Sequence, residues 1–138
     1  MASSHSDKSL RWTPLWLLLG ICLVITVIYL SLTAKPPVVM NFEFSDKVGH
    51  FLAYAVLMGW FGQIFTGRLP LILFALGFVL MGVSLEFVQG MGRHRHFEYA
   101  DMVANMIGVI LGLLLTITVF KGSLRWVEQR VILRRIKT

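Results

Sequence analysis

Four apolar runs separated by short polar segments dominate the chain. The first covers residues 14–33, the second about 47–65, the third 69 to about 89 and the fourth 101–120. A bilayer core about 30 Å thick is crossed by about 20 predominantly apolar helical residues. The pattern therefore predicts an all-α, polytopic integral membrane protein in which four transmembrane helices form a bundle.

The segments between the runs are short and contain residues that break helices. "AKPP" follows the first run, and "TGRLP" separates the second from the third.

The first run also resembles a signal peptide, but its apolar core is longer than usual and "SLTAKPP" offers no small-x-small cleavage site. We therefore predict a cytoplasmic segment at 1–13, an anchoring helix at 14–33, a three-helix core at 46–120 and a basic cytoplasmic tail at 121–138.

Composition and charge support a membrane location and set an orientation. The chain is 57% hydrophobic with a mean hydropathy of +0.75, which is too apolar for a soluble domain. Its net charge of +6 comes from bases outside the apolar runs, with no basic stripe among aromatics, so we expect no nucleic-acid partner. Placing both termini in the cytoplasm puts nine of the 13 Lys and Arg residues on that side.

Two further features lie outside the core. The basic tail is compatible with a helix, and we expect it to rest on anionic lipid head groups. Cys22 is the single cysteine, so the chain has no internal disulfide. Because Cys22 lies inside an apolar run, we predict a buried thiol that packs as a small hydrophobic side chain.

Polar residues within the three core runs recur at helical spacing, so those of each run share one face. They are Asp46, His50 and Tyr54 on the second run, Glu86 and Gln89 on the third, and Asp101, Asn105, Gly108 and Gly112 on the fourth. The last two glycines form a GxxxG pattern, which predicts close helix packing.

The predicted orientation brings these polar faces to one depth. The second and fourth runs begin, and the third ends, at the outer membrane surface, so His50, Glu86 and Asn105 lie about one turn inside. Ionisable groups are costly in hydrocarbon and face the bundle interior. One interpretation is a polar plug that holds the helices in register, with Asp46 and Asp101 as ordinary acids at helix starts. Interhelical hydrogen bonds contribute only about 0.6 kcal/mol on average, so we prefer a functional cluster.

Three segments together resemble the VanZ-like family, which is named for a teicoplanin-resistance protein. They are "DKVGHFLAYAVL", "LEFVQ" and "RHFEYADMVANMIGVILG", and they span residues 46–112. The matching positions are Asp46, Lys47, His50, Phe51, Tyr54, Glu86, Gln89, Arg95, Asp101, Asn105 and Gly108. Arg93, His94 and His96 are not elements of the pattern, and the first run and the tail lie outside it.

The resemblance implies a small multi-pass protein of the bacterial inner membrane. The founding member of the family is associated with lowered sensitivity to teicoplanin. We therefore expect a protein of the cell envelope that binds or acts on a lipid-linked or amphiphilic molecule at its outer face, with a link to glycopeptide resistance. Its partners would be membrane lipid and, if it oligomerises, further copies of itself.

Candidate roles follow from side-chain chemistry. Lys47 and Arg95 are suited to hold a phosphate or carboxylate. His50, Glu86 and Asp101 are the candidate acids and bases, and Asp46, Tyr54, Gln89 and Asn105 are further ligand-binding candidates. Whether a reaction is catalysed stays open, since the nearest hydroxyl, Ser84, is expected to bond to its own helix.

Three alternative roles for the polar cluster remain open. The first is a non-catalytic structural or interaction subunit whose polar cluster only packs the helices. The second is a metal site, since His50, His94, His96, Glu86 and Asp101 are all ligand types. No Cys and no His-x-x-x-His pair supports it, so we expect neither metal nor cofactor. The third is a proton-coupled transporter, for which four helices are few unless the protein oligomerises.

Overall fold

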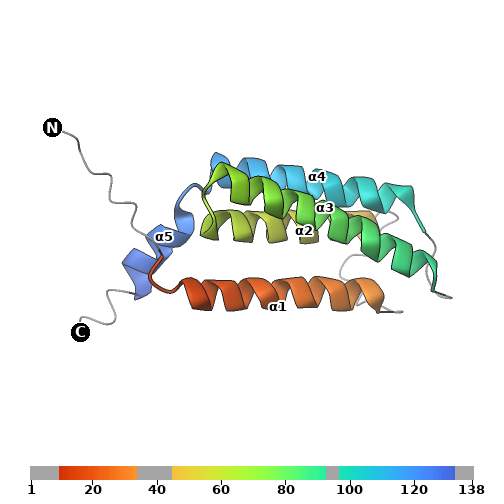
Figure 1. The fold of residues 1–138 in the computed structure, drawn as a ribbon, viewed down its shortest axis with the longest axis horizontal. Coiled ribbons are helices and arrows are strands. Elements are labelled where there is room, and N and C mark those ends of the chain that lie inside the picture. Colours follow the sequence, from red (N-terminus) through yellow and green to blue (C-terminus); the bar gives the residue numbers. More distant parts are fainter. Residues whose placement is uncertain (1–9, 34–44, 93–96, 133–138) are drawn as a thin grey trace.

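The computed structural model describes residues 10–33, 45–92 and 97–132, and these residues confirm the predicted all-α fold. The helices are α1 (Thr13–Leu32), α2 (Ser45–Ile64), α3 (Arg68–Gly90), α4 (Tyr99–Ile117) and α5 (Ser123–Val127), followed by a π-helical turn at Glu128–Ile132. Helices α1 to α4 run alternately in opposite directions (Figure 1). The starts of α2 and α4 and the ends of α1 and α3 therefore lie together, and we call this the polar end.

Large apolar side chains are exposed on the outside of the bundle, and some charged side chains are buried. Ile25 on α1 and Leu80 on α3 are 59% and 66% exposed, whereas Glu86 and Asp101 are 1% and 5% exposed. Among the described helices, α1, α3 and α4 are long and apolar enough to cross a membrane. An apolar surface with some charged side chains buried inside is the distribution expected for a helix bundle in lipid. A multi-pass membrane protein is thus plausible.

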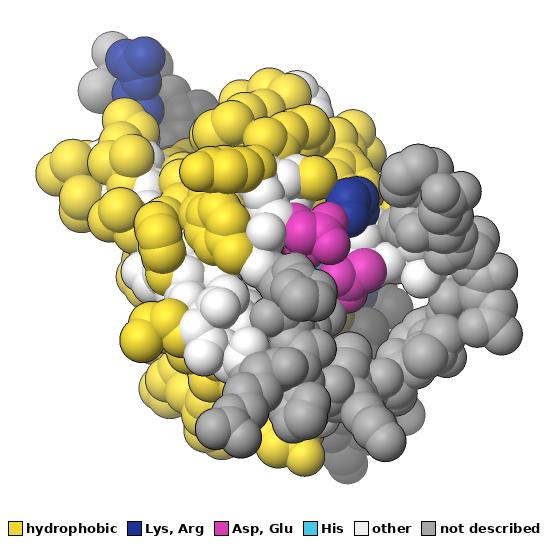
Figure 2. Space-filling view, turned by 90° about the vertical axis from the view of Figure 1, so that its right-hand side faces the viewer, with side chains coloured by type: hydrophobic (Ala, Val, Ile, Leu, Met, Phe, Trp, Pro, Cys, Tyr) yellow, Lys and Arg dark blue, Asp and Glu magenta, His cyan; other side chains and the backbone are white. Residues whose placement is uncertain are grey.

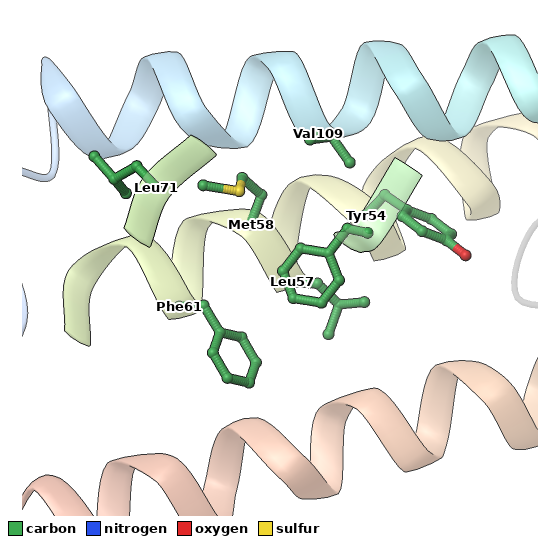
Figure 3. Close-up of a cluster of buried hydrophobic side chains, with 7 residues drawn as sticks. Tyr54, Leu57, Met58, Phe61, Leu71 and Val109 are labelled. Atoms are coloured by element: carbon green, nitrogen blue, oxygen red, sulfur yellow. The ribbon is translucent and has the colours of Figure 1, made fainter. Parts of the chain in front are cut away.

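Helix α2 is as long as α1 but does not reach the same apolarity, in part because its first two turns carry Asp46, Lys47 and His50. It supplies four side chains of the main hydrophobic core, which packs among all the long helices (Figure 3). The buried members of this core are Tyr54, Leu57, Met58, Phe61, Leu71, Phe78 and Val109. A helix shielded by its neighbours needs fewer apolar residues than one surrounded by lipid.

Helices α2 and α4 are parallel and approach each other most closely. A Cβ atom added to Gly108 or Gly112 would collide with the backbone carbonyl oxygen of Phe51 or Ala55, respectively. One turn further along α4, the Thr116 hydroxyl donates to a carbonyl of α2 at 3.4 Å. These contacts recur every four residues on both helices, so the backbones are in fixed register. The close packing predicted from the GxxxG pattern is confirmed.

Helix α1 attaches to the bundle along one side. The Trp60 indole donates to the backbone carbonyl of Trp16 at 3.0 Å, and the two rings meet edge to face at 6.0 Å. Gly20 faces the ring of Phe61, where a Cβ atom would come within 2.9 Å. Cys22 is exposed, so the prediction of a buried thiol is wrong, because only one side of α1 is covered by protein.

The start of the tail is helical and anchored to the start of α1, whereas the sequence predicted a segment resting on lipid. One carboxylate oxygen of Glu128 accepts the backbone N–H groups of Arg11 and Trp12 at 2.6 and 3.1 Å. The other oxygen accepts the Trp16 indole N–H at 3.3 Å. Free N–H groups at a helix start attract an acid, which explains why this glutamate is only 3% exposed.

Candidate functional site

Charged side chains gather at the polar end, with hydrophobic surface on one side of them (Figure 2). Asp46 lies in the first turn of α2 and Asp101 in the first turn of α4, as the sequence predicts. Glu98 is the residue immediately before α4, and Lys47 follows Asp46. The positive ends of two helix dipoles therefore lie beside these carboxylates and stabilise them.

His50 connects α2 to α4 just inside this end. Its Nδ1 lies 3.2 Å from the amide oxygen of Asn105. Its Nε2 lies 3.9 Å from Asp46 Oδ2 and 3.8 Å from Asp101 Oδ2. The structure thus brings together four of the residues that the sequence singled out, and their ring and carboxylate atoms converge on the Nε2 side of the imidazole.

Lys47 bridges the two acids beside it. Its ammonium lies 2.6 Å from Glu98 Oε2 and 3.5 Å from Asp101 Oδ1. The Asp101 carboxylate, whose side chain is 7% exposed, consequently faces Lys47 with one oxygen and His50 with the other. Lys47 and His50 together fix the orientation of this buried acid.

Glu86 and Gln89 make contacts that tie other segments to α3. Glu86 Oε1 accepts the backbone N–H of Glu98 at 2.7 Å, which holds the residue in front of α4. The Gln89 amide donates to the backbone carbonyl of Ser31 at 2.6 Å, which holds the last turn of α1. Both side chains are buried, so each contributes to holding the polar end together.

Tyr54 and Gly82 lie directly beneath the cluster. Tyr54 is 1% exposed, and its hydroxyl has no hydrogen-bond partner among the described residues. Figure 3 shows this hydroxyl pointing along the bundle away from Phe61. A Cβ atom on Gly82 would lie 3.0 Å from Asn105 Nδ2 and 3.2 Å from Tyr54 Cζ, so Gly82 gives these two side chains their space.

Several predicted or related residues fall elsewhere. Arg95 lies outside the described residues, as do Arg93, His94 and His96. That Arg95 and Lys47 together hold a phosphate or carboxylate therefore stays a prediction. Ser84 donates to the carbonyl of Leu80 on its own helix at 2.8 Å, as expected.

The role of Glu98 was not predicted from the sequence: its side chain contacts Lys47 and its backbone N–H contacts Glu86. An acid just before a predicted helix start was the available signal. The metal site weighed from the sequence included His50 and Asp101 but not Asp46. In the structure Asp46, His50 and Asp101 each offer a ligand atom within 4.8 Å of the others, a spacing that could hold a metal ion.

Comparison with known proteins gives one informative similarity. The chain is 34% identical over 107 residues to an uncharacterized protein of the fission yeast Schizosaccharomyces pombe. The aligned region is 75% of this chain and 64% of that protein, so this chain spans less than two thirds of its relative. No protein-family profile and no solved structure matches the chain. A related sequence thus occurs in a fungus, and the VanZ-like resemblance stays a prediction.

Proposed function

We propose that the chain crosses the membrane four times, with α2 as the fourth span, both termini in the cytoplasm and the polar end outside. Support comes from the exposed apolar surface of α1, α3 and α4 and from the position of α2 among them. The distribution of Lys and Arg along the sequence supports the orientation. For a VanZ-like protein the corresponding location is the bacterial inner membrane.

Thiol labelling tests this topology. We expect Cys22, which faces lipid in this arrangement, to resist a water-soluble maleimide in membranes and to react after denaturation in dodecyl sulfate. In a Cys22→Ser background, Met91→Cys at the polar end should be labelled on intact cells by an impermeant maleimide. Arg68→Cys, exposed at the opposite end, should be labelled only after permeabilisation. Labelling of both sites on intact cells would contradict the topology.

The function that the site supports best is binding of a phosphate-bearing amphiphile, either a membrane lipid or a lipid-linked envelope molecule. The observation that carries this proposal is the charged cluster at one end of a bundle whose flanks are apolar (Figure 2). A head group would meet Lys47 while its chains lie along the flanks. Because a related sequence occurs in a fungus, we favour a head group common to bacteria and fungi over a peptidoglycan precursor.

A structural role is the second candidate, and it too has a specific observation in its favour. Glu86, Gln89 and Asn105 each bond to a neighbouring segment, as expected of side chains that hold helices together. In that case the protein would be a non-catalytic membrane component. A link to teicoplanin resistance follows only from the VanZ-like resemblance and is part of the proposal.

Lipid retention separates these two functions. Purified protein is exchanged into mixed micelles of phosphatidylglycerol and phosphatidylcholine, and bound lipid is counted by native mass spectrometry. We expect Lys47→Gln to lower retention of the anionic lipid about tenfold, because one charge-assisted contact is lost. Arg68→Gln removes the same charge from the opposite end and should change retention little. If Lys47→Gln lowers thermal stability but leaves lipid retention unchanged, the structural role is correct.

A further inference from the structure

Three potential metal ligands converge at the polar end. Asp46 and His50 lie one turn apart on α2, and Asp101 lies opposite them in the first turn of α4. His50 Nε2 is 3.9 Å from Asp46 Oδ2 and 3.8 Å from Asp101 Oδ2, and one ligand atom of each residue lies within 4.8 Å of the other two. Two ligands on one ion at about 2.1 Å are about 3 to 3.5 Å apart, so small side-chain rotations would bring all three onto a common centre.

The hydrogen bond at the other side of the imidazole determines what faces that centre. His50 Nδ1 lies 3.2 Å from Asn105 Oδ1, and an amide oxygen can only accept a hydrogen bond. Nδ1 is therefore the protonated nitrogen, which leaves the lone pair of a neutral ring on Nε2 directed at two carboxylates. Fixing the tautomer of a ligating histidine through its other nitrogen is a regular feature of metal sites.

The surroundings have the electrostatics and access of a cation site. Lys47 approaches the Oδ1 atom of Asp101, so the Oδ2 atom is the one directed at His50. Among the described residues the polar end holds four carboxyl groups (Asp46, Glu86, Glu98 and Asp101) and a single lysine. The side chains of His50 and Asp101 are 10% and 7% exposed, whereas that of Asp46 is 53% exposed, so the centre is walled on the helix side and accessible on the other.

We propose that Asp46, His50 and Asp101 form a binding site for a divalent first-row metal ion, of the class of Mn²⁺, Fe²⁺ or Zn²⁺. One imidazole and two carboxylates suit these ions better than Cu⁺, which prefers sulfur, or Ca²⁺, which takes an all-oxygen shell. Three protein ligands leave at least one coordination position for water or another oxygen ligand. Metal binding itself goes beyond the proposed function. That a head-group phosphate occupies the open position rests on the proposed function.

The test uses the full chain, purified without a histidine tag, stripped with chelator and held in a neutral detergent. Mn²⁺ is titrated and free ion is followed by electron paramagnetic resonance. We expect one saturable site per chain, with nitrogen hyperfine coupling from a bound imidazole in the pulsed spectrum. Asp46→Asn and His50→Gln should each weaken binding at least tenfold, and His50→Gln should abolish the nitrogen signal.

Two control variants give the test its specificity. Glu98→Gln removes the same charge as Asp46→Asn from the same end without removing a proposed ligand, and should weaken binding about threefold or less. The double variant His94→Gln, His96→Gln should retain the site. Equal weakening by Glu98→Gln and Asp46→Asn, loss of the nitrogen signal in the double variant, or absence of a saturable site would overturn the proposal. Because lipid is absent from the titration, its failure is separate from failure of the lipid-retention experiment.

Discussion

Replacing Gly108 by alanine is expected to destabilise the folded protein by about 1–3 kcal/mol, the usual cost of adding a methyl group to a tightly packed interior. The added Cβ would collide with the carbonyl oxygen of Phe51, which belongs to the backbone of α2 and cannot rotate away. Relief requires α2 and α4 to separate along their length. Thermal unfolding in detergent, followed by circular dichroism, measures the effect, and Gly112→Ala should behave alike.

Gly77 provides the matched control for this substitution. It lies within α3, and a Cβ atom there meets nothing within 4 Å. Gly77→Ala should therefore leave stability unchanged or raise it by up to about 1 kcal/mol, because alanine is the better helix former. If Gly108→Ala and Gly77→Ala have the same melting temperature, the close approach of α2 and α4 described above is incorrect.

Replacing Glu128 by alanine is expected to cost about 1–3 kcal/mol and to loosen the start of α1. One carboxylate accepts three N–H groups from Arg11, Trp12 and Trp16, and the last of these donors is buried. Removing the acceptor leaves the indole without this partner and frees the π-helical turn of the tail from the start of α1. A lower melting temperature would show the loss of stability, and faster hydrogen exchange in the first turn of α1 would show the loosened helix start.

A neighbouring residue serves as the control for Glu128. Gln129 is exposed on the same turn, and Gln129→Ala should change stability by no more than about 0.5 kcal/mol. Glu128→Gln keeps an acceptor oxygen but loses the charge, so its effect should lie between those of the other two variants. If Glu128→Ala leaves exchange in α1 unchanged, the carboxylate does not hold the helix start.

Much of the helical framework could be predicted because apolar runs of about 20 residues leave few alternatives to helices. The meeting of His50 with Asn105 also followed from the sequence, since spacing put each on a polar face and helix direction put both at one end. Prediction of α4 was less accurate: it begins at Tyr99 and ends at Ile117, whereas the apolar run extended over 101–120. Residue type alone does not show where a helix end satisfies its backbone groups.

The anchor at Glu128 could not be predicted, because it joins residues more than 110 positions apart in the chain. Within the tail the acid is surrounded by basic and apolar residues, and nothing in its spacing indicates a partner on α1. The short distances among Asp46, His50 and Asp101 escaped prediction for a related reason. The sequence put each residue on the correct face, but the distances depend on the register between α2 and α4, which is set by glycine contacts in the middle of the bundle.

That register also determines which parts of the molecule can move. Sliding α4 along α2 by one residue would move Gly108 and Gly112 away from the carbonyl oxygens they face. The two helices therefore move together as one rigid pair. Asp46, His50 and Asp101 all lie on this rigid α2–α4 pair. Helix α1 contacts this pair through Trp60, whose indole donates to the carbonyl of Trp16. Helix α3 contacts it through Glu86, which accepts the backbone N–H of Glu98. We therefore expect any opening at the polar end to be a movement of α1 or α3, with a ligand entering beside the α2–α4 pair.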